Sequence, residues 1–225
     1  MEETHAGGVP GGKPLLRGVL HEVGAFVALA AGTILVLRAG SARARIAAAI
    51  YGISLVALLA ASAVYHRGRW TERARAVLRR VDHSAIFVLI AGTYTPFALL
   101  LGSRAGWTLL AVVWAGALLG VVMSVAWVKA PKPLVAVVCV ALGWAAVPVL
   151  PALHAALGTW AVLLLVTGGV VYSLGAAVYA LRRPDPFPTV FGYHELFHAL
   201  VVVAAACHFA VVAGAVSALG GGVRC

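Results

Sequence analysis

The chain has 225 residues, of which 63% are hydrophobic and only 11% are charged. Since a soluble domain carries roughly 25% charged residues, this composition and the mean hydropathy of +1.01 exclude a soluble protein and indicate an integral membrane protein. The formal net charge is +10, but the basic residues fall in short loops between apolar runs. They therefore indicate membrane topology and no nucleic-acid partner.

Seven apolar runs predict seven membrane-spanning helices. A helix needs about 20 apolar residues to cross the bilayer, and the runs are too long for strands and lack the alternation of an outer-membrane barrel. In chain order the predicted spans are 18–37, 46–65, 84–101, 107–128, 134–150, 160–181 and 193–218. The fifth is the weakest, because Pro148 and Pro151 close it early. The fold class is thus all-α, with one transmembrane domain over 18–218 and tails over 1–17 and 219–225.

The charges of the loops predict that the N-terminus is cytoplasmic and the C-terminus outside. In that orientation the inside segments hold twelve basic residues: Lys13, Arg17, Arg67, Arg69, Arg73, Arg75, Arg79, Arg80, Lys129, Lys132, Arg182 and Arg183. The outside segments hold five: Arg38, Arg43, Arg45, Arg104 and Arg224. An excess of Lys and Arg marks the cytoplasmic side of a membrane protein.

Polar residues from three distant parts of the chain are predicted to lie on one side of the membrane. His66 ends the second span, Asp82 opens the third, where a carboxylate suits the helix dipole, and His194 opens the seventh. Ends of even spans and starts of odd spans share one side, whichever way the chain is oriented. By the charge count that side is the cytoplasm.

These residues have the chemistry of a catalytic zinc site. His194 and His198 are four residues apart on one helical face, and Ser62 and His66 have the same spacing. Three neutral imidazoles, from His66, His194 and His198, with one open position form the ligand set of a catalytic Zn²⁺. Asp82 and Ser62 would hold and deprotonate a zinc-bound water.

The segment from His194 to His198 also matches the H-E-x-x-H motif of zinc proteases, in which the glutamate is the general base. Only His208 lies downstream, ten residues on, which does not fit the spacing of a further ligand. The third ligand then comes from upstream, so Asp82 is an equally good base. Glu195 is interpreted as a lipid-interface or helix-start residue, with a role as base the less favoured alternative.

Besides Glu195, three more residues are candidates for supporting the ligands without binding the metal. His21 and Glu22 open the first span on the predicted cytoplasmic side, where they can line the cavity or steady the ligands. His83 adjoins Asp82 but points about 100° away from it on a helix.

Three motifs resemble those of the hemolysin III family, within the progestin and adiponectin receptor superfamily. They are Ser62-Ala-Val-Tyr-His66-Arg67, Arg80-Val-Asp82-His83-Ser84-Ala-Ile-Phe87 with Gly92-Thr-Tyr-Thr-Pro96, and His194-Glu-Leu-Phe-His198. The resemblance implies seven helices, a zinc ion near the cytoplasmic side held by His66, His194 and His198, and contact of Ser62 and Asp82 with its water. It also implies a link to hydrolysis of ceramide-type amides, whereas bacterial members carry the name hemolysin.

Two functions of different classes follow as expectations. The first is a zinc-dependent intramembrane hydrolase of the cell membrane, with Asp82 as general base, Ser62 aiding the oxyanion or water, and a lipid-like amide or ester as substrate. The second is a membrane-lytic or pore-forming protein, or a receptor-like sensor, in which zinc is structural. Few polar residues lie in the outer half of the predicted spans, which disfavours a pore, and the sequence leaves the oligomeric state open.

Overall fold

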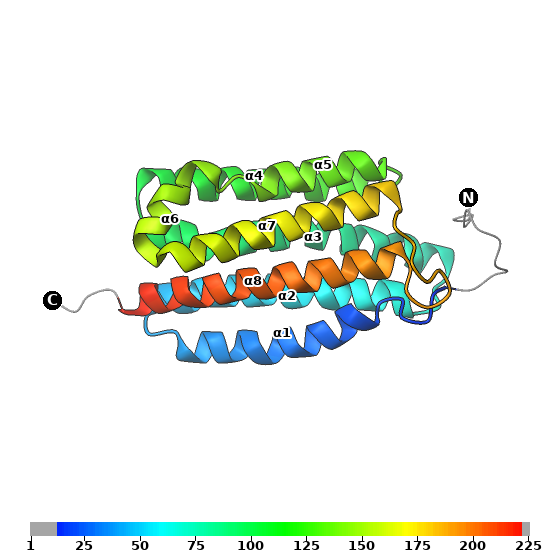
Figure 1. Cartoon of the computed structure of the whole chain (residues 1–225), viewed down its shortest axis with the longest axis horizontal. Coiled ribbons are helices and arrows are strands. Elements are labelled where there is room, and N and C mark those ends of the chain that lie inside the picture. The colour runs from blue at the N-terminus through cyan, green and yellow to red at the C-terminus, as the bar shows by residue number, and fades with distance from the viewer. Residues whose placement is uncertain (1–12, 222–225) are drawn as a thin grey trace.

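The structure is a computed structural model that describes residues 13–221. The described chain folds into helices α1 (Val19–Arg38), α2 (Ala42–Arg67), α3 (Glu72–Leu101), α4 (Arg104–Ala126), α5 (Lys132–Gly143), α6 (Leu150–Leu157), α7 (Thr159–Leu181) and α8 (Tyr193–Gly221). A short 3-10 helix, η1 (Val147–Val149), lies between α5 and α6, and no strand occurs among the described residues. The helices run side by side in one bundle (Figure 1).

The predicted all-α fold with seven membrane crossings is confirmed. Within residues 13–221, seven helical segments are long and apolar enough to span a membrane, with α5 to α6 counting as one segment, Lys132–Leu157. The first described residues and the end of α8 lie at opposite ends of the bundle (Figure 1), as an odd number of crossings requires. Which end faces the cytoplasm stays a prediction from the loop charges. Of the predicted tails, residues 1–12 and 222–225 lie outside the described residues.

The fifth span does not close at residue 150 as expected; it is interrupted and continues to Leu157. Pro148 lies at the start of η1 and Pro151 at the start of α6. A backbone N–H at the start of a helix has no partner within the helix, so proline, which lacks this N–H, costs no hydrogen bond there. The Tyr94 hydroxyl donates to the Gly143 carbonyl and accepts from the Ala146 N–H. Because lipid offers no partners to freed backbone groups, this tyrosine of α3 explains how the chain tolerates a break inside the membrane.

Helix α3 begins three turns earlier than the apolar run that predicted it. Thr71 caps the helix by accepting a hydrogen bond from the Ala74 N–H at 3.3 Å. Residues 72–83 are largely polar but include four arginines, two alanines and one leucine, which are good helix formers. Asp82 therefore lies well inside the helix, and the expectation that it occupies the first turn and meets the helix dipole there is wrong.

Helices α2, α3 and α8 form the centre of the bundle. Each of the three packs against the other two, while α1 packs on α2, α4 on α3, and α7 on α8. The central helices carry the buried apolar side chains, among them Tyr51, Phe87 and Val212. The outer helices expose side chains such as Phe26, Leu119 and Leu174. Since exposed apolar surface of this extent is unfavourable in water, it is the surface that meets lipid.

Candidate metal centre

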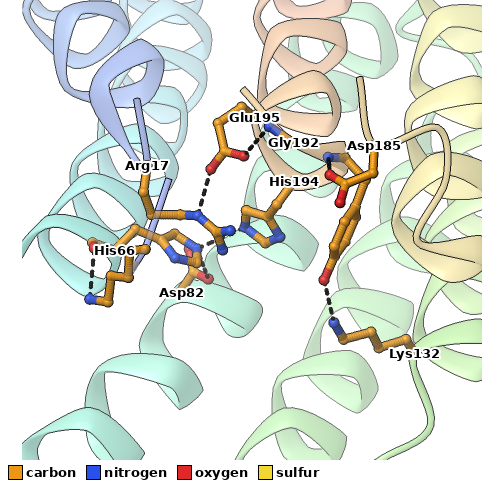
Figure 2. A network of polar contacts seen from close by, with 10 residues as sticks. Arg17, His66, Asp82, Lys132, Asp185, Gly192, His194 and Glu195 are labelled. Atoms are coloured by element: carbon orange, nitrogen blue, oxygen red, sulfur yellow. Dashed lines mark hydrogen bonds and ion pairs between the residues drawn. The ribbon is translucent and has the colours of Figure 1, made fainter. Parts of the chain in front are cut away.

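Three histidines from two central helices meet at the end of the bundle where the described chain begins. His66 lies in the last turn of α2, and His194 and His198 lie in the first two turns of α8. One ring nitrogen of each lies within 4.8 Å of the other two, and Nε2 of His66 is 3.1 Å from Nε2 of His194 (Figure 2). The predicted convergence of these distant residues is therefore observed, and the three can hold a metal ion.

Asp82 and Ser62 lie beside the histidines. The Oδ2 atom of Asp82 is 3.9 Å from Nε2 of His66, and Figure 2 shows the carboxyl below that ring. Both Asp82 and Ser62 are buried, and the Ser62 side chain donates a hydrogen bond to the Asp82 carboxyl. Asp82 is not part of the converging group, so its carboxyl lies beside the three histidines and is not one of the candidate ligands.

His21 of α1 adds a fourth imidazole to the centre. Its ring stacks on the His198 ring with centroids 3.8 Å apart and planes within 6° of parallel. The side chain is buried, and neither ring nitrogen has a hydrogen-bond partner among the described residues. His21 is not among the residues whose ring nitrogens converge, so it contacts the centre by packing its ring on that of His198.

Glu195 is buried, and both of its carboxylate oxygens have a partner. Its Oε1 lies 2.5 Å from Nε of Arg17, and its Oε2 accepts a hydrogen bond from the Gly192 N–H at 2.9 Å (Figure 2). The second contact is that of a glutamate in the first turn bonding back to the residue before the helix. The side chain is only 1% exposed, so Glu195 does not lie at the lipid interface, and its carboxyl does not line the cavity described below.

Glu22 and His83, the other two residues expected to support the ligands, lie in different places. Glu22 pairs with Arg67 at 2.6 Å, both side chains more than 40% exposed, at the edge of the bundle. His83 is partly buried and lines the same cavity as Asp82. The structure thus brings His83 to the site and leaves Glu22 outside it.

A segment that sequence reasoning assigned to a tail, Lys13 to Arg17, packs directly on the centre. The Lys13 ammonium donates to the carbonyls of His66 and Gly68, and the N–H of Leu15 donates to Thr189 in the loop before α8. Burial and the nearby charges of other basic residues lower the pKa of Lys13. The family resemblance extends over this segment, but hydropathy and periodicity do not reveal where it packs, because its contacts join residues more than fifty positions apart.

A cavity of about 550 Å³ extends inward from the histidines. Its walls come from α2, α3, α5, α7 and α8. Apolar side chains such as Ile86, Val135 and Val201 line the middle, and Trp144 and His208 lie in the inner part. A volume of this size accommodates a small-molecule ligand.

The chemistry of the donors fits a zinc ion. Three imidazoles are a common protein ligand set for zinc in catalytic sites, which leave a further position open. The Nε2 atoms of His66 and His194, 3.1 Å apart at this site, can share one proton in a hydrogen bond or one metal ion. No hard-cation set of several carboxylate oxygens occurs at this place in the described part of the chain.

Known proteins are similar to this chain over nearly its whole length. The profile of a family described as haemolysin-III related matches residues 12–209. The "Hemolysin-3 homolog" of Bacillus subtilis (strain 168) is 33% identical over 199 residues, covering 87% of this chain and 90% of the relative. "Hemolysin-3" of Bacillus cereus is 32% identical over 199 residues, covering 87% and 88%. With the seven apolar helices, these matches confirm the resemblance seen in the motifs and the prediction of a multi-pass protein of the cell membrane.

Proposed function

This chain belongs to the haemolysin-III related family, and we propose that it is a zinc-dependent membrane hydrolase of a lipid-like amide or ester. The observation that carries the proposal is the position of the three converging histidines at one end of a cavity of about 550 Å³. A metal that only stabilised the bundle would have no need of an adjoining space for a ligand.

In this proposal His66, His194 and His198 hold the ion. Zinc in such a set supplies Lewis acidity, which polarises a carbonyl and favours ionisation of water. Asp82 takes a proton from the attacking water at Oδ2 and passes it to the leaving nitrogen or oxygen as the acyl C–N or C–O bond breaks. Ser62 holds the Asp82 carboxyl in place through its hydrogen bond.

The contacts of the two carboxylates support the assignment of Asp82 rather than Glu195 as the base. Both oxygens of Glu195 already have partners, Arg17 and the Gly192 N–H. Asp82 lines the cavity and lies 3.9 Å from a ligand histidine. A base must lie within reach of the proton it removes, and Asp82 meets this condition for a molecule bound beside the histidines.

The experiment compares purified wild-type protein with His66→Ala, His198→Ala and Asp82→Asn variants. We expect about one zinc per chain in the wild type and in Asp82→Asn, and very little in the histidine variants. Hydrolysis of a short-chain ceramide, measured as released fatty acid, is expected to fall at least a hundredfold in Asp82→Asn. His154→Ala is the control, because His154 lies in α6 at the other end of the bundle, bonded to Thr159. Unchanged hydrolysis in Asp82→Asn would contradict the proposed base.

The names of the two relatives favour a second candidate function, lysis of membranes with zinc in a structural role. In that case leakage of a dye from phosphatidylcholine and phosphatidylglycerol vesicles persists in Asp82→Asn, provided that the variant keeps its zinc. Leakage that is absent in the wild type, together with Asp82-dependent hydrolysis, favours the hydrolase.

A further inference from the structure

The outer end of the cavity carries an excess of positive charge. Its lining includes six basic residues, Lys13, Arg17, Arg75, Arg79, Lys129 and Lys132, and two acidic ones, Glu72 and Asp82. Arg17 is already neutralised by Glu195, and Asp82 belongs to the proposed catalytic set. The remaining basic side chains line the same cavity as the histidines.

The loop charges that orient a membrane protein do not by themselves explain this lining. They account for basic residues at this end of the bundle but not for the direction in which those residues point. On α3, Arg73 and Arg80 do not line the cavity, and Arg80 instead donates to the carbonyl of Val125. Arg75 and Arg79 are four residues apart, share one helical face, and both line the cavity.

The guanidinium groups of Arg75 and Arg79 have N–H donors available for a ligand. Neither guanidinium makes a hydrogen bond or an ion pair within 4 Å among residues 13–221. Arg75 is exposed, and the partly buried Arg79 attracts Asp82 only at longer range. The pKa of Lys13 nearby is lowered by burial first and then by the charges of Arg75, Arg17 and Arg69. Basic groups crowded in this way repel one another, and an anion bound between them removes that repulsion.

Residues on one face of α3 line the cavity in three successive zones: two arginines, then Asp82, then two isoleucines. At a rise of 1.5 Å per residue, Arg79 lies about 4.5 Å and Arg75 about 10 Å outward from Asp82. Ile86 and Ile90 lie about 6 Å and 12 Å inward from it, and all of these residues line the cavity. An amphiphile with its apolar chain inward and its reacting bond beside Asp82 therefore places its outer group between the two arginines.

We propose that Arg75 and Arg79 form an anion-binding subsite, and that the substrate is an acyl amide or ester whose leaving part carries a carboxylate or phosphate. The identity of the bond that is cut rests on the proposed function; the subsite itself does not. A neutral ceramide-type headgroup offers neither guanidinium an anionic acceptor, whereas an anionic headgroup can accept hydrogen bonds from both.

The test measures binding of two probes that differ only in the terminal group of the headgroup, a carboxylate in one and a neutral hydroxymethyl group in the other. N-dodecanoylglycine and N-dodecanoylethanolamine have the same acyl chain and amide, and only the first carries a carboxylate. Titration calorimetry in a non-ionic detergent is expected to give about tenfold tighter binding of the anionic probe to wild-type protein. The preference should disappear in the Arg75→Gln/Arg79→Gln variant and persist in Arg73→Gln, the matched control on the same helix. Zinc content, which the arginines do not determine, shows that each variant is folded.

Three results would overturn the subsite: equal affinity for the two probes, binding of neither, or a preference that survives in the double variant. The last result would mean that the histidine site itself binds the carboxylate.

Displacement of the anionic probe by inorganic phosphate at similar concentration supports the subsite and assigns it to a free anion, whereas displacement only by acylated anions assigns it to a headgroup. If binding shows the preference but neither probe is hydrolysed, the hydrolase proposal fails and the subsite stands. If both probes bind and react equally, the hydrolase stands and the subsite fails.

Discussion

Arg17 and Glu195 form a buried ion pair that ties the N-terminal segment to the helix carrying two of the three converging histidines. The Arg17 Nε is 2.5 Å from Glu195 Oε1, with side-chain exposures of 12% and 1%. A second pair, Arg67 and Glu22, has similar geometry at 2.6 Å, but its side chains are 45% and 42% exposed. The two pairs differ mainly in burial, which makes one a natural control for the other.

We predict that Glu195→Gln lowers the free energy of unfolding by about 2–3 kcal/mol, because it leaves the Arg17 guanidinium buried without its counter-charge. Glu22→Gln should cost less than about 1 kcal/mol, since water screens the exposed pair. Thermal unfolding in detergent, followed by circular dichroism, measures both. Equal effects would contradict a stabilising role for the buried pair.

The same Glu195→Gln variant also separates the two candidate bases. Glu195 is engaged by Arg17 and by the Gly192 N–H, so we expect Glu195→Gln to keep hydrolytic activity within about tenfold of wild type when assayed below its unfolding temperature. Asp82→Asn should lose far more. A loss in Glu195→Gln as large as that in Asp82→Asn would restore the protease-like interpretation of the motif.

The His21 ring is predicted to hold His198 in its metal-binding orientation through their stack, with centroids 3.8 Å apart. His21→Ala removes the stack and should weaken zinc affinity about tenfold, as loss of groups that orient ligands does. His21→Phe keeps an aromatic ring and removes two buried nitrogens that lack partners, so its zinc affinity should stay near wild type. Competition with a fluorescent zinc chelator measures both. If His21→Phe loses zinc as His21→Ala does, a ring nitrogen of His21 is needed instead.

Close packing of α2 on α3 should make Gly92 intolerant of a side chain. A Cβ at Gly92 would lie 2.8 Å from the Ser54 Cβ and nearer still to its Oγ, so the two helices must separate. We expect Gly92→Ala to destabilise the bundle by about 1–3 kcal/mol. Gly214→Ala in α8, where no atom lies within 4 Å of the added Cβ, should be neutral or stabilising. Thermal unfolding of the two variants side by side gives the comparison.

Hydropathy and spacing predicted the helices and the meeting of His66, Asp82 and His194, because span parity is a property of chain order alone. They did not predict how far α3 extends, since apolar runs mark membrane thickness and the polar residues 72–83 are helical for other reasons. Hydropathy and spacing also did not predict the ion pair of Arg17 with Glu195. A tail residue has no periodicity to reveal where it packs, and only the folded bundle brings it to α8.

The orientation of the bundle remains to be measured, and it decides from which side a headgroup reaches the arginines. Arg183, in the loop before α8, and Arg104, at the start of α4, are exposed and lie at opposite ends of the bundle. In a cysteine-free background, made by replacing Cys139, Cys207 and Cys225 with Ala, we predict that Arg104→Cys in intact cells reacts with a membrane-impermeant maleimide. Arg183→Cys should react only after the membrane is permeabilised, because the excess of Lys and Arg holds its end in the cytoplasm. The reverse pattern would place the histidines, Arg75 and Arg79 outside the cell, and a substrate would then approach from the outer leaflet.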